Sequence, residues 1–208
     1  MPPSSNEMDP SSATLAILAG GQGSRMGRPK GEIRIGGQPI LSYLLDRFSW
    51  PGPTLLVTAP GREHPPAWKE FDREVVDPVS DQGPLRGILT ALENLKTPLL
   101  LVATLDMPGV QRSQLLWLLD EMRKSPHRLG LMLRRSAEAK AIEPFPSAFR
   151  AGAREIISRR IQARNLSVQK LIEEKGFEIS SAPPSWDSRT WANLNSPDDL
   201  TNFTDSMS

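Results

Sequence analysis

The sequence predicts an α/β protein with a mostly parallel central sheet, and three observations support this. Short apolar runs of strand length alternate with longer amphipathic stretches, the pattern of strands joined by crossover helices. The first run, 14–19 (TLAILA), is continuously apolar, as expected of a strand buried on both faces. A glycine-rich segment follows it directly, where open α/β sheets bind their ligands.

The same patterns place the other elements along the chain. We expect strands at 14–19, 32–35, 54–59, 74–76, 99–103, 128–133 and 191–194. We expect helices that open at Pro39, Pro84 and Ser113, helical segments at about 147–160 and 167–175, and a last helix that opens at Ser196. The last of these starts is well marked, because proline and two acidic residues follow the serine.

The length of 208 residues fits a single domain. Residues 1–12 are rich in proline and serine and are expected to form a disordered tail, so the domain is placed at 13–208. The tail has no apolar core of a signal peptide, and no apolar run is long enough to span a bilayer. The chain contains no cysteine, which excludes disulfides and thiolate metal sites. We therefore expect a cytoplasmic protein without membrane contact.

The charge balance gives no reason to expect a nucleic-acid partner. The chain has 25 lysine and arginine residues against 24 aspartate and glutamate residues, a formal net charge of +1. Nucleic-acid binders usually carry a clustered basic face, which such a balance does not indicate.

The segment 18–30 (LAGGQGSRMGRPK) combines four glycines with two cations that could face a ligand: Gly20, Gly21, Gly23, Gly27, Arg25 and Lys30. Glycine lets backbone N–H groups turn toward a ligand and lets phosphates approach closely. A triphosphate needs such donors together with fixed positive charge. The spacing matches neither a Walker A loop nor the dinucleotide fingerprint. Alone, the segment is either a phosphate-binding loop or an ordinary glycine-rich turn.

Two acidic residues follow predicted strands at the sheet edge where ligands bind. Asp106 comes after the strand at 99–103, and Asp77 ends the strand at 74–76. Asp106 could hold Mg²⁺ against phosphate oxygens, whereas Asp77 could accept hydrogen bonds from a nucleobase or a ribose. Either residue could instead simply form a turn. The glycine loop and Lys30 favour the metal role for Asp106.

Asn193 and Asn195 alternate with apolar residues on the last predicted strand, so both amides should leave by the same face. Paired amides suit a polar ligand or a metal shell. The alternative is that Asn195 forms an Asx turn and cap with the Ser196-Pro197 sequence that follows.

Four segments together resemble the signature of the MobA-like nucleotidyltransferases, and most closely the molybdenum cofactor guanylyltransferases. They occur in the family's order: LAGGQGSRMGRPK (18–30), DQGPLRGI (81–88), TLDMP (104–108) and WANLNSPDDL (191–200). Ala19-Gly20-Gly21 favours the guanylyl branch, because cytidylyl relatives more often read Ala-Ala-Gly. Arg86 departs from the pattern, since small residues are commoner there, and it is expected to contact phosphate or to point to solvent. Glu143-Pro144-Phe145-Pro146 resembles, loosely, a segment that shapes the acceptor site.

The resemblance implies a single-domain, Rossmann-like, three-layer α/β/α nucleotidyltransferase fold. It implies Mg²⁺-dependent transfer of GMP from GTP to molybdopterin with release of pyrophosphate. Arg25, Lys30 and Asp106 are then catalytic, and Asp106 binds the metal. The implied nucleotide-binding positions are Leu18, Ala19, Gly20, Gly21, Gly23, Arg25, Lys30, Asp77, Gly83, Pro84 and Leu85. Asn193 and Asn195 are expected to bind the acceptor.

Two alternatives stay open beside this reading. A sister enzyme of the same fold would use another nucleotide or acceptor, as molybdopterin cytidylyltransferases and sugar- or polyol-phosphate nucleotidyltransferases do. A non-catalytic nucleotide-binding protein is disfavoured because Arg25, Lys30 and Asp106 are all present. Beyond GTP and molybdopterin, we expect only transient contact with other proteins of molybdenum cofactor biosynthesis or with acceptor proteins. The sequence leaves the oligomeric state open.

Overall fold

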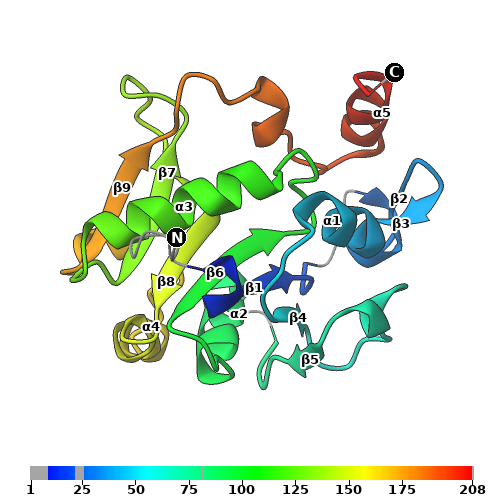
Figure 1. Cartoon of the computed structure of the whole chain (residues 1–208). Helices are drawn as coiled ribbons and strands as arrows, with labels where there is room; N and C mark the ends of the chain where they lie inside the picture. Colours follow the sequence, from blue (N-terminus) through cyan, green and yellow to red (C-terminus); the bar gives the residue numbers. More distant parts are fainter. Residues whose placement is uncertain (1–8, 22–25, 81, 208) are drawn as a thin grey trace, which may run out of the picture.

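A computed structural model describes residues 9–21, 26–80 and 82–207 (Figure 1). Its main sheet has seven strands in the order β5-β4-β1-β6-β8-β7-β9. The strands are β1 (Ala13–Leu18), β4 (Thr54–Thr58), β5 (Arg73–Val76), β6 (Leu99–Thr104), β7 (Gly130–Arg134), β8 (Glu143–Arg150) and β9 (Phe177–Ser181). The α-helices are α1 (Ile40–Phe48), α2 (Gly83–Glu93), α3 (Arg112–Lys124), α4 (Ala153–Gln162) and α5 (Pro197–Asp205).

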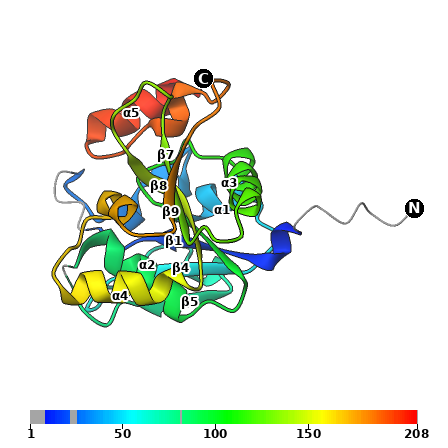
Figure 2. The same ribbon diagram turned by 90° about the vertical axis from the view of Figure 1, so that its left-hand side faces the viewer.

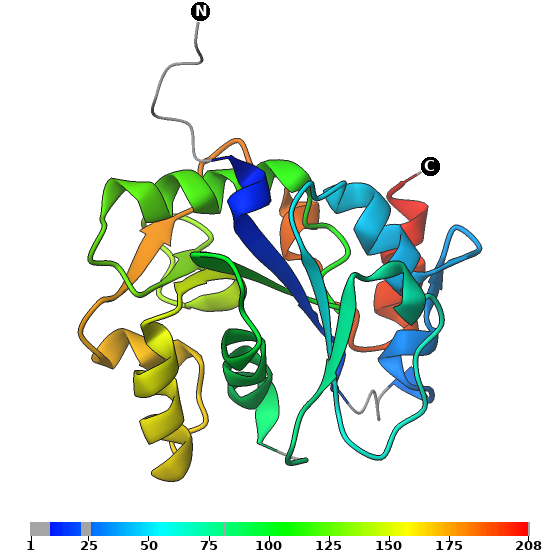
Figure 3. The ribbon, with the colours of Figure 1, turned by 60° about the horizontal axis from the view of Figure 1, so that its bottom comes forward.

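Helices cover both faces of this sheet, which confirms the predicted α/β/α layering. Helices α1 and α3 lie on one face, and α2 and α4 lie side by side on the other (Figures 2 and 3). Helix α5 stands apart from both layers, near the small hairpin formed by β2 (Arg34–Ile35) and β3 (Gln38–Pro39) (Figure 1). Among the residues that the structure describes, no helix is long and apolar enough to cross a membrane.

The first four strands of the sheet order, β5-β4-β1-β6, are all parallel. β1 pairs with β4 on one side and with β6 on the other, so successive strands are added first on one side of β1 and then on the other. In β1 the residues Leu15 and Ile17 are fully buried, as the continuous apolar run predicts. Open sheets bind ligands beside such a switch point, outside the carboxyl ends of the strands. Here those ends belong to β1 and β6.

The expected helix at about 147–160 is wrong in its first part. Residues Glu143–Arg150 form β8, which runs antiparallel to both β6 and β7, and helix α4 begins only at Ala153. Two prolines in the segment argue against a central strand, because proline cannot donate to the ladder. In the structure β6 pairs only with Ser147–Arg150, and the β7 register shifts between Leu131 and Leu133. Pro144 and Pro146 lie in this irregular part of the ladder, before the four residues that pair with β6.

The C-terminal third differs from the prediction in two further places. The segment 167–175 is helical only as a 3₁₀ turn at Gln169–Glu173, and it leads into strand β9, which was not predicted. The expected strand at 191–194 is absent: a 3₁₀ turn at Ser188–Trp191 ends there, and the following residues are irregular. One backbone hydrogen bond, from Leu194 N–H to the Asp106 carbonyl at 2.8 Å, replaces the expected ladder.

The helix starts and the N-terminal segment are reproduced in part. Helix α5 has the predicted Ser196 cap, whose hydroxyl group accepts from Asp199 N–H. Helix α3 begins one residue after Gln111, which takes the N-cap position expected for Ser113. The expected tail 1–12 lies mostly outside the described residues, and its last part, Pro10–Ser12, forms a 3₁₀ turn. Short 3₁₀ turns also occur at Lys30–Glu32 and Trp68–Glu70.

Candidate active site

A cavity of about 800 Å³ opens at the carboxyl ends of the parallel strands. Each strand contributes residues at or just after its end: Gly20 and Gly21 after β1, Ala59, Pro60, Gly61 and Arg62 after β4, Asp77 after β5, and Thr104 at the end of β6 with Leu105, Asp106 and Met107 after it. The start of α2 and the start of β8 complete the wall with Gly83, Pro84, Arg86, Gly87, Glu143, Pro144 and Phe145. The fold therefore gathers residues that lie far apart in sequence.

The glycine loop forms the part of the wall nearest to β1. Ala19 N–H still donates to Val57 of β4 at 2.8 Å, and the chain then leaves the sheet at Gly20 and Gly21. The Arg62 guanidinium reaches across from the β4 side and donates to the Gly21 carbonyl at 2.9 Å. Of the predicted nucleotide-binding residues, Gly23 and Arg25 lie outside the described residues.

Lys30 lies between two residues from distant parts of the chain. Its ammonium group contacts the Asp106 carboxylate at 2.8 Å and donates to the Asn195 side-chain oxygen at 3.1 Å. The Lys30 and Asp106 side chains are only 14% and 28% exposed, so solvent screens this pair less than it would screen a surface pair. The structure thus brings together three predicted site residues: a cation, an acid and an amide.

The segment that carries the two asparagines is held against the end of β6. Besides the Leu194 hydrogen bond to Asp106, the chain passes so close to Gly109 that a Cβ atom there would lie 1.7 Å from the Arg189 carbonyl oxygen. Because the segment is not a strand, the asparagines do not share a strand face as expected. Asn193 lines the cavity and donates to the Trp191 carbonyl at 3.2 Å, whereas Asn195 contacts Lys30.

The opposite wall is the first turn of α2. Gly83 has a φ of +65°, which favours glycine at the helix start. A Cβ atom on Gly87 would lie 3.2 Å from the Leu18 side chain, so glycine permits the close packing of α2 on the end of β1. Leu85, a predicted nucleotide-binding residue, is fully buried in the core and does not line the cavity.

Asp77 faces the cavity beside α2. Its N–H donates to the Thr58 carbonyl at 2.8 Å, which continues the β4–β5 ladder to the end of the strand. Its Oδ1 atom is buried and has no hydrogen-bond partner among the described residues. Burial raises the pKa of the Asp77 carboxyl group, against the lowering effects of the Thr90 hydroxyl group and the Arg86 charge. Buried polar atoms without a hydrogen-bond partner are rare in folded proteins.

Three lining residues were missed or misplaced by sequence reasoning. Arg62 follows β4 by only four residues, and its charge at a strand end was the available signal. Phe145 was noted only through a loose resemblance. Arg86 neither points to solvent nor stands ready as a free phosphate contact, since it is buried and bonded to residues of its own helix.

The residues around Lys30 fit a magnesium ion better than a transition metal. The described residues contain no cluster of three or more histidine, cysteine, aspartate or glutamate side chains. They do place the Asp106 carboxylate and the Asn195 amide oxygen around one cation, the Lys30 ammonium group. Mg²⁺ prefers such oxygen donors, and one or two carboxylates suffice when substrate phosphates and water complete its shell.

The fold and this site define the class of protein. Among solved structures, the chain is similar to molybdopterin-guanine dinucleotide biosynthesis protein A from Archaeoglobus fulgidus (TM-score 0.77, 23% identity, 93% of this chain and 98% of that one). It is also similar to 2-C-methyl-D-erythritol 4-phosphate cytidylyltransferase from Thermus thermophilus (TM-score 0.67, 17% identity, 92% and 97%). The shared architecture is an α/β nucleotidyltransferase fold.

The sequence comparisons narrow this class. The family model of the MobA-like NTP transferase domain matches residues 15–178. The chain is 33% identical to the molybdenum cofactor guanylyltransferase of Pseudomonas aeruginosa PAO1, over 91% of this chain and 93% of the relative. It is 43% identical to that of Ralstonia nicotianae over 48% of this chain and 50% of the relative. The chain belongs to the MobA-like nucleotidyltransferases, in the family of the molybdenum cofactor guanylyltransferases, and is thus an enzyme of this class.

Proposed function

We propose that this enzyme transfers GMP from GTP to molybdopterin and releases pyrophosphate, with Mg²⁺ as its cofactor. The observation that carries the proposal is the contact of Lys30 with both Asp106 and Asn195, because Lys30 and Asp106 line a cavity large enough for a nucleotide together with Gly20 and Gly21. The family relationship supports the choice of substrates.

The triphosphate is assigned to the side of the cavity formed by the glycine loop. Backbone N–H groups at Gly20 and Gly21 and the Lys30 ammonium group supply donors and positive charge at the end of β1. Arg62 adds a second cation to the same wall. Gly23 and Arg25 lie outside the described residues, so their assignment to the phosphates rests on the sequence alone.

Asp106 and Asn195 are the residues that would hold Mg²⁺. Bound there, the ion would neutralise negative charge on the phosphates of the substrate. Until substrate arrives, the Lys30 ammonium group balances the Asp106 charge. In the substrate complex, Lys30 would donate to the phosphates, so the same three side chains serve both states.

The base is assigned to the wall made by Asp77 and the first turn of α2. The Asp77 carboxylate, which lines the cavity, would accept from the adjacent N1–H and N2–H groups of guanine. Cytosine and adenine present a ring-nitrogen acceptor at that position, which the carboxylate would repel. This contact is the structural argument for GTP over other nucleotides.

The acceptor is assigned to the side of the cavity that Asn193 and the start of β8 provide. Phe145, Pro144 and Glu143 line this side, next to Asp106. The terminal phosphate oxygen of molybdopterin would attack the α-phosphorus of GTP. The bond from that phosphorus to the bridging oxygen breaks, and pyrophosphate leaves with the electron pair. The protein's contribution is positioning and charge neutralisation.

The choice of nucleotide can be tested by a thermal-shift comparison of GTP, CTP, ATP and UTP, each with Mg²⁺. We expect a selective rise in melting temperature with GTP, since a ligand that binds only the folded state stabilises it. A selective rise with CTP would contradict the guanylyl assignment and favour the sister cytidylyltransferase.

The reaction itself can be followed by pyrophosphate release with molybdopterin as acceptor. We expect release that requires both GTP and the acceptor and that stops when EDTA removes divalent ions. Release that continues in EDTA would contradict the Mg²⁺ assignment, and release from GTP with a sugar phosphate but not with molybdopterin would contradict the acceptor.

A further inference from the structure

The connection that follows β4 lies against the described part of the glycine loop. Residues 59–67 lead from β4 to the 3₁₀ turn at Trp68–Glu70, and we call them the β4 loop. The first part of this loop lines the cavity. Its Arg62 side chain donates through Nη1 to the Gly21 carbonyl at 2.9 Å. A guanidinium group has five N–H donors, and Arg62 is exposed, so this hydrogen bond leaves donors that a ligand in the cavity can use.

The β4 loop also packs on the residue that follows Lys30. A Cβ atom on Gly31 would lie 2.7 Å from the Pro65 Cβ atom, closer than two side chains approach each other, so glycine permits the loop to pack on the backbone here. Gly31 is buried, which makes this contact part of the packed structure. The β4 loop therefore touches the chain at Gly21 and beside Lys30, two residues that line the cavity.

His64 anchors the β4 loop to the sheet. Its Nδ1 atom lies 2.7 Å from the Glu74 Oε2 atom, on the edge strand β5. Because a carboxylate oxygen only accepts, the Nδ1 atom carries the hydrogen of this contact. The other carboxylate oxygen, Oε1, accepts from the Thr58 hydroxyl group at 2.8 Å, at the end of β4. The Glu74 side chain is only 9% exposed, so the imidazole is bound to a carboxylate that is itself fixed.

A ring contact holds His64 from a second direction. Its ring stacks on the Trp68 ring, with centroids 4.1 Å apart and an angle of 16° between the planes. Trp68 N–H donates to the Pro65 carbonyl at 3.2 Å, and this turn brings the indole back beside the imidazole. In sequence, His64 lies between Arg62 and Pro65, the two residues that contact the glycines. A side chain fixed at this position limits the movement of both.

We propose that His64 is a positioning residue for the triphosphate: it keeps the β4 loop in place, so that Arg62 stays at the cavity wall beside Gly21. This inference rests on the proposed function, because it names how the enzyme would hold the phosphates of its nucleotide. Lys30 has its own contact with Asp106, so loss of the anchor leaves that pair in place. The effect therefore falls on nucleotide binding and not on the transfer step.

The experiment compares the kinetics of GTP in His64→Leu and His64→Asn variants. Leucine removes the N–H donor, whereas the asparagine amide nitrogen replaces Nδ1 at about the same distance from the backbone. We expect His64→Leu to raise the KM for GTP by about tenfold with kcat within about threefold, and His64→Asn to stay within about threefold in both. An unchanged KM in His64→Leu, a loss in kcat instead of KM, or an equal loss in His64→Asn would each overturn the proposal.

A double-mutant cycle tests whether His64 acts through Arg62. Residues that act through one another give effects that do not add, whereas independent residues give effects that do. We expect Arg62→Met to raise the KM for GTP by about tenfold. In that background, His64→Leu should change the KM by less than about twofold. A full effect of His64→Leu in both backgrounds would overturn the proposal.

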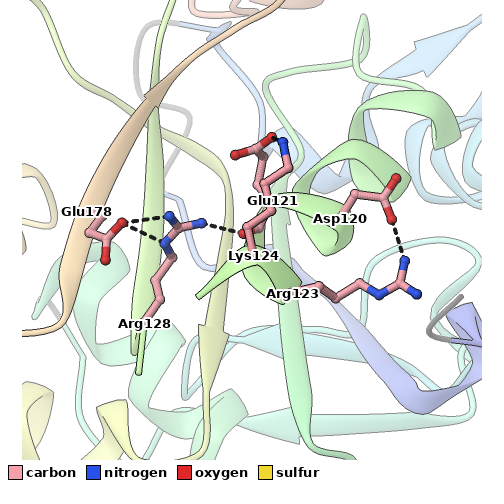
Figure 4. A network of polar contacts seen from close by, with 6 residues as sticks. All are labelled: Asp120, Glu121, Arg123, Lys124, Arg128 and Glu178. Carbon is pink, nitrogen blue, oxygen red and sulfur yellow. Dashed lines mark hydrogen bonds and ion pairs between the residues drawn. The ribbon is translucent and has the colours of Figure 1, made fainter. Parts of the chain in front are cut away.

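Arg128 provides the matched control, because it binds a carboxylate on the other edge strand of the sheet. Its Nε and Nη2 atoms donate to Glu178 of β9, at 2.9 and 2.6 Å (Figure 4). Arg128 precedes β7, which runs parallel to β6, so it lies at the end of the sheet opposite the cavity. Arg128→Met should lose stability and keep the KM for GTP. A raised KM in this variant would overturn the proposal, because the KM would then report general destabilisation.

Two safeguards keep the outcomes separate. If His64→Leu does not fold, the double variant His64→Leu/Glu74→Gln carries the test, because it leaves no unpaired charge at the buried Glu74 position. Inorganic triphosphate with Mg²⁺, titrated by calorimetry, is a probe that has neither base nor acceptor. If the wild type transfers no nucleotide from GTP but binds this probe about tenfold more tightly than His64→Leu does, the proposed function fails and the role of His64 stands. If the wild type uses GTP and His64→Leu keeps its KM, only the role of His64 fails.

Discussion

The two halves of the sheet build their parts of the site in different ways. In the half formed by β5-β4-β1-β6, the strands are parallel, and both acidic residues of the candidate site, Asp77 and Asp106, follow a strand end within two positions. In the half formed by β8-β7-β9, the strands are mixed in direction, and Asn193 and Asn195 come from an irregular connection. The proposed nucleotide side thus follows from the geometry of the fold, whereas the proposed acceptor side depends on a few specific contacts.

Those contacts lie where the two halves meet. Asn195 contacts Lys30, Leu194 N–H binds the Asp106 carbonyl, and Gly109 admits the Arg189 carbonyl. We call this contact region, formed by Gly109, Leu194 and Asn195, the seam. Substitutions at or beside the seam should change nucleotide binding and nucleotidyl transfer to different extents, and they can be ranked by expected effect.

The largest effect is expected from loss of the charges on the nucleotide side. Lys30→Ala and Asp106→Ala should each lower kcat at least about a hundredfold, because each removes charge stabilisation in a partly buried site. Lys96→Ala and Asp120→Ala change exposed residues of the same types and serve as controls for kcat and for the circular-dichroism melting curve. Near-normal turnover in either site variant would break the assignment.

The second effect is expected at the seam itself. Gly109→Ala would place a Cβ atom 1.7 Å from the Arg189 carbonyl oxygen, so the backbone of the C-terminal segment must move. We expect a stability loss of about 1–3 kcal/mol and a larger loss of transfer than of GTP binding. Denaturant melts and GTP titrations of the same samples measure both.

Gly152→Ala is its control, because there the new Cβ meets only the flexible Leu129 side chain, at 3.1 Å. Equal losses of GTP binding and transfer in Gly109→Ala would show that the seam does not separate the two halves.

A smaller effect is expected from Asn195→Ala. The Lys30 ammonium group loses one acceptor and keeps Asp106. A hydrogen bond to a charged group corresponds to about a tenfold change, so kcat should fall by about that factor in steady-state assays at saturating substrate. A fall as large as that of Asp106→Ala would contradict this ranking, because it would show that the Asn195 amide matters to turnover as much as the Asp106 carboxylate.

The smallest expected effect is on stability, and here the substitution should raise the melting temperature instead of lowering it. A carboxyl group whose pKa is raised on folding contributes stability only at low pH, and this is lost as pH rises through the folded pKa. Asp77 is such a group. Asp77→Asn should therefore raise the melting temperature at neutral pH by about 2–4 °C, for about 1 kcal/mol of relieved burial, while GTP selectivity falls.

The pH dependence tests the sign of this prediction. The difference in melting temperature between Asp77→Asn and the wild type should shrink as pH falls toward about 4, where the wild-type carboxyl becomes protonated in both states. A difference that grows at low pH would contradict the raised pKa.

Sequence patterns predicted the parallel half well and the mixed half poorly, for physical reasons. A strand buried on both faces, such as β1, shows itself as a continuous apolar run, and Asp106 follows from the position of β6. In β8 two prolines argue against a central strand, and the local sequence does not show that they precede the residues paired with β6 and fall where the β7 register shifts. The Lys30–Asn195 contact joins residues far apart in sequence, and local patterns carry no information on such pairs.

The return of the C-terminal segment to the end of β6 has a consequence for the order of synthesis. A ribosome releases β1, β4, β5 and β6 early, but a domain generally folds as one unit. The amide beside Lys30 comes from Asn195, which is translated 165 residues later. The three side chains of the candidate site can therefore meet only after almost all of the printed sequence has been synthesised.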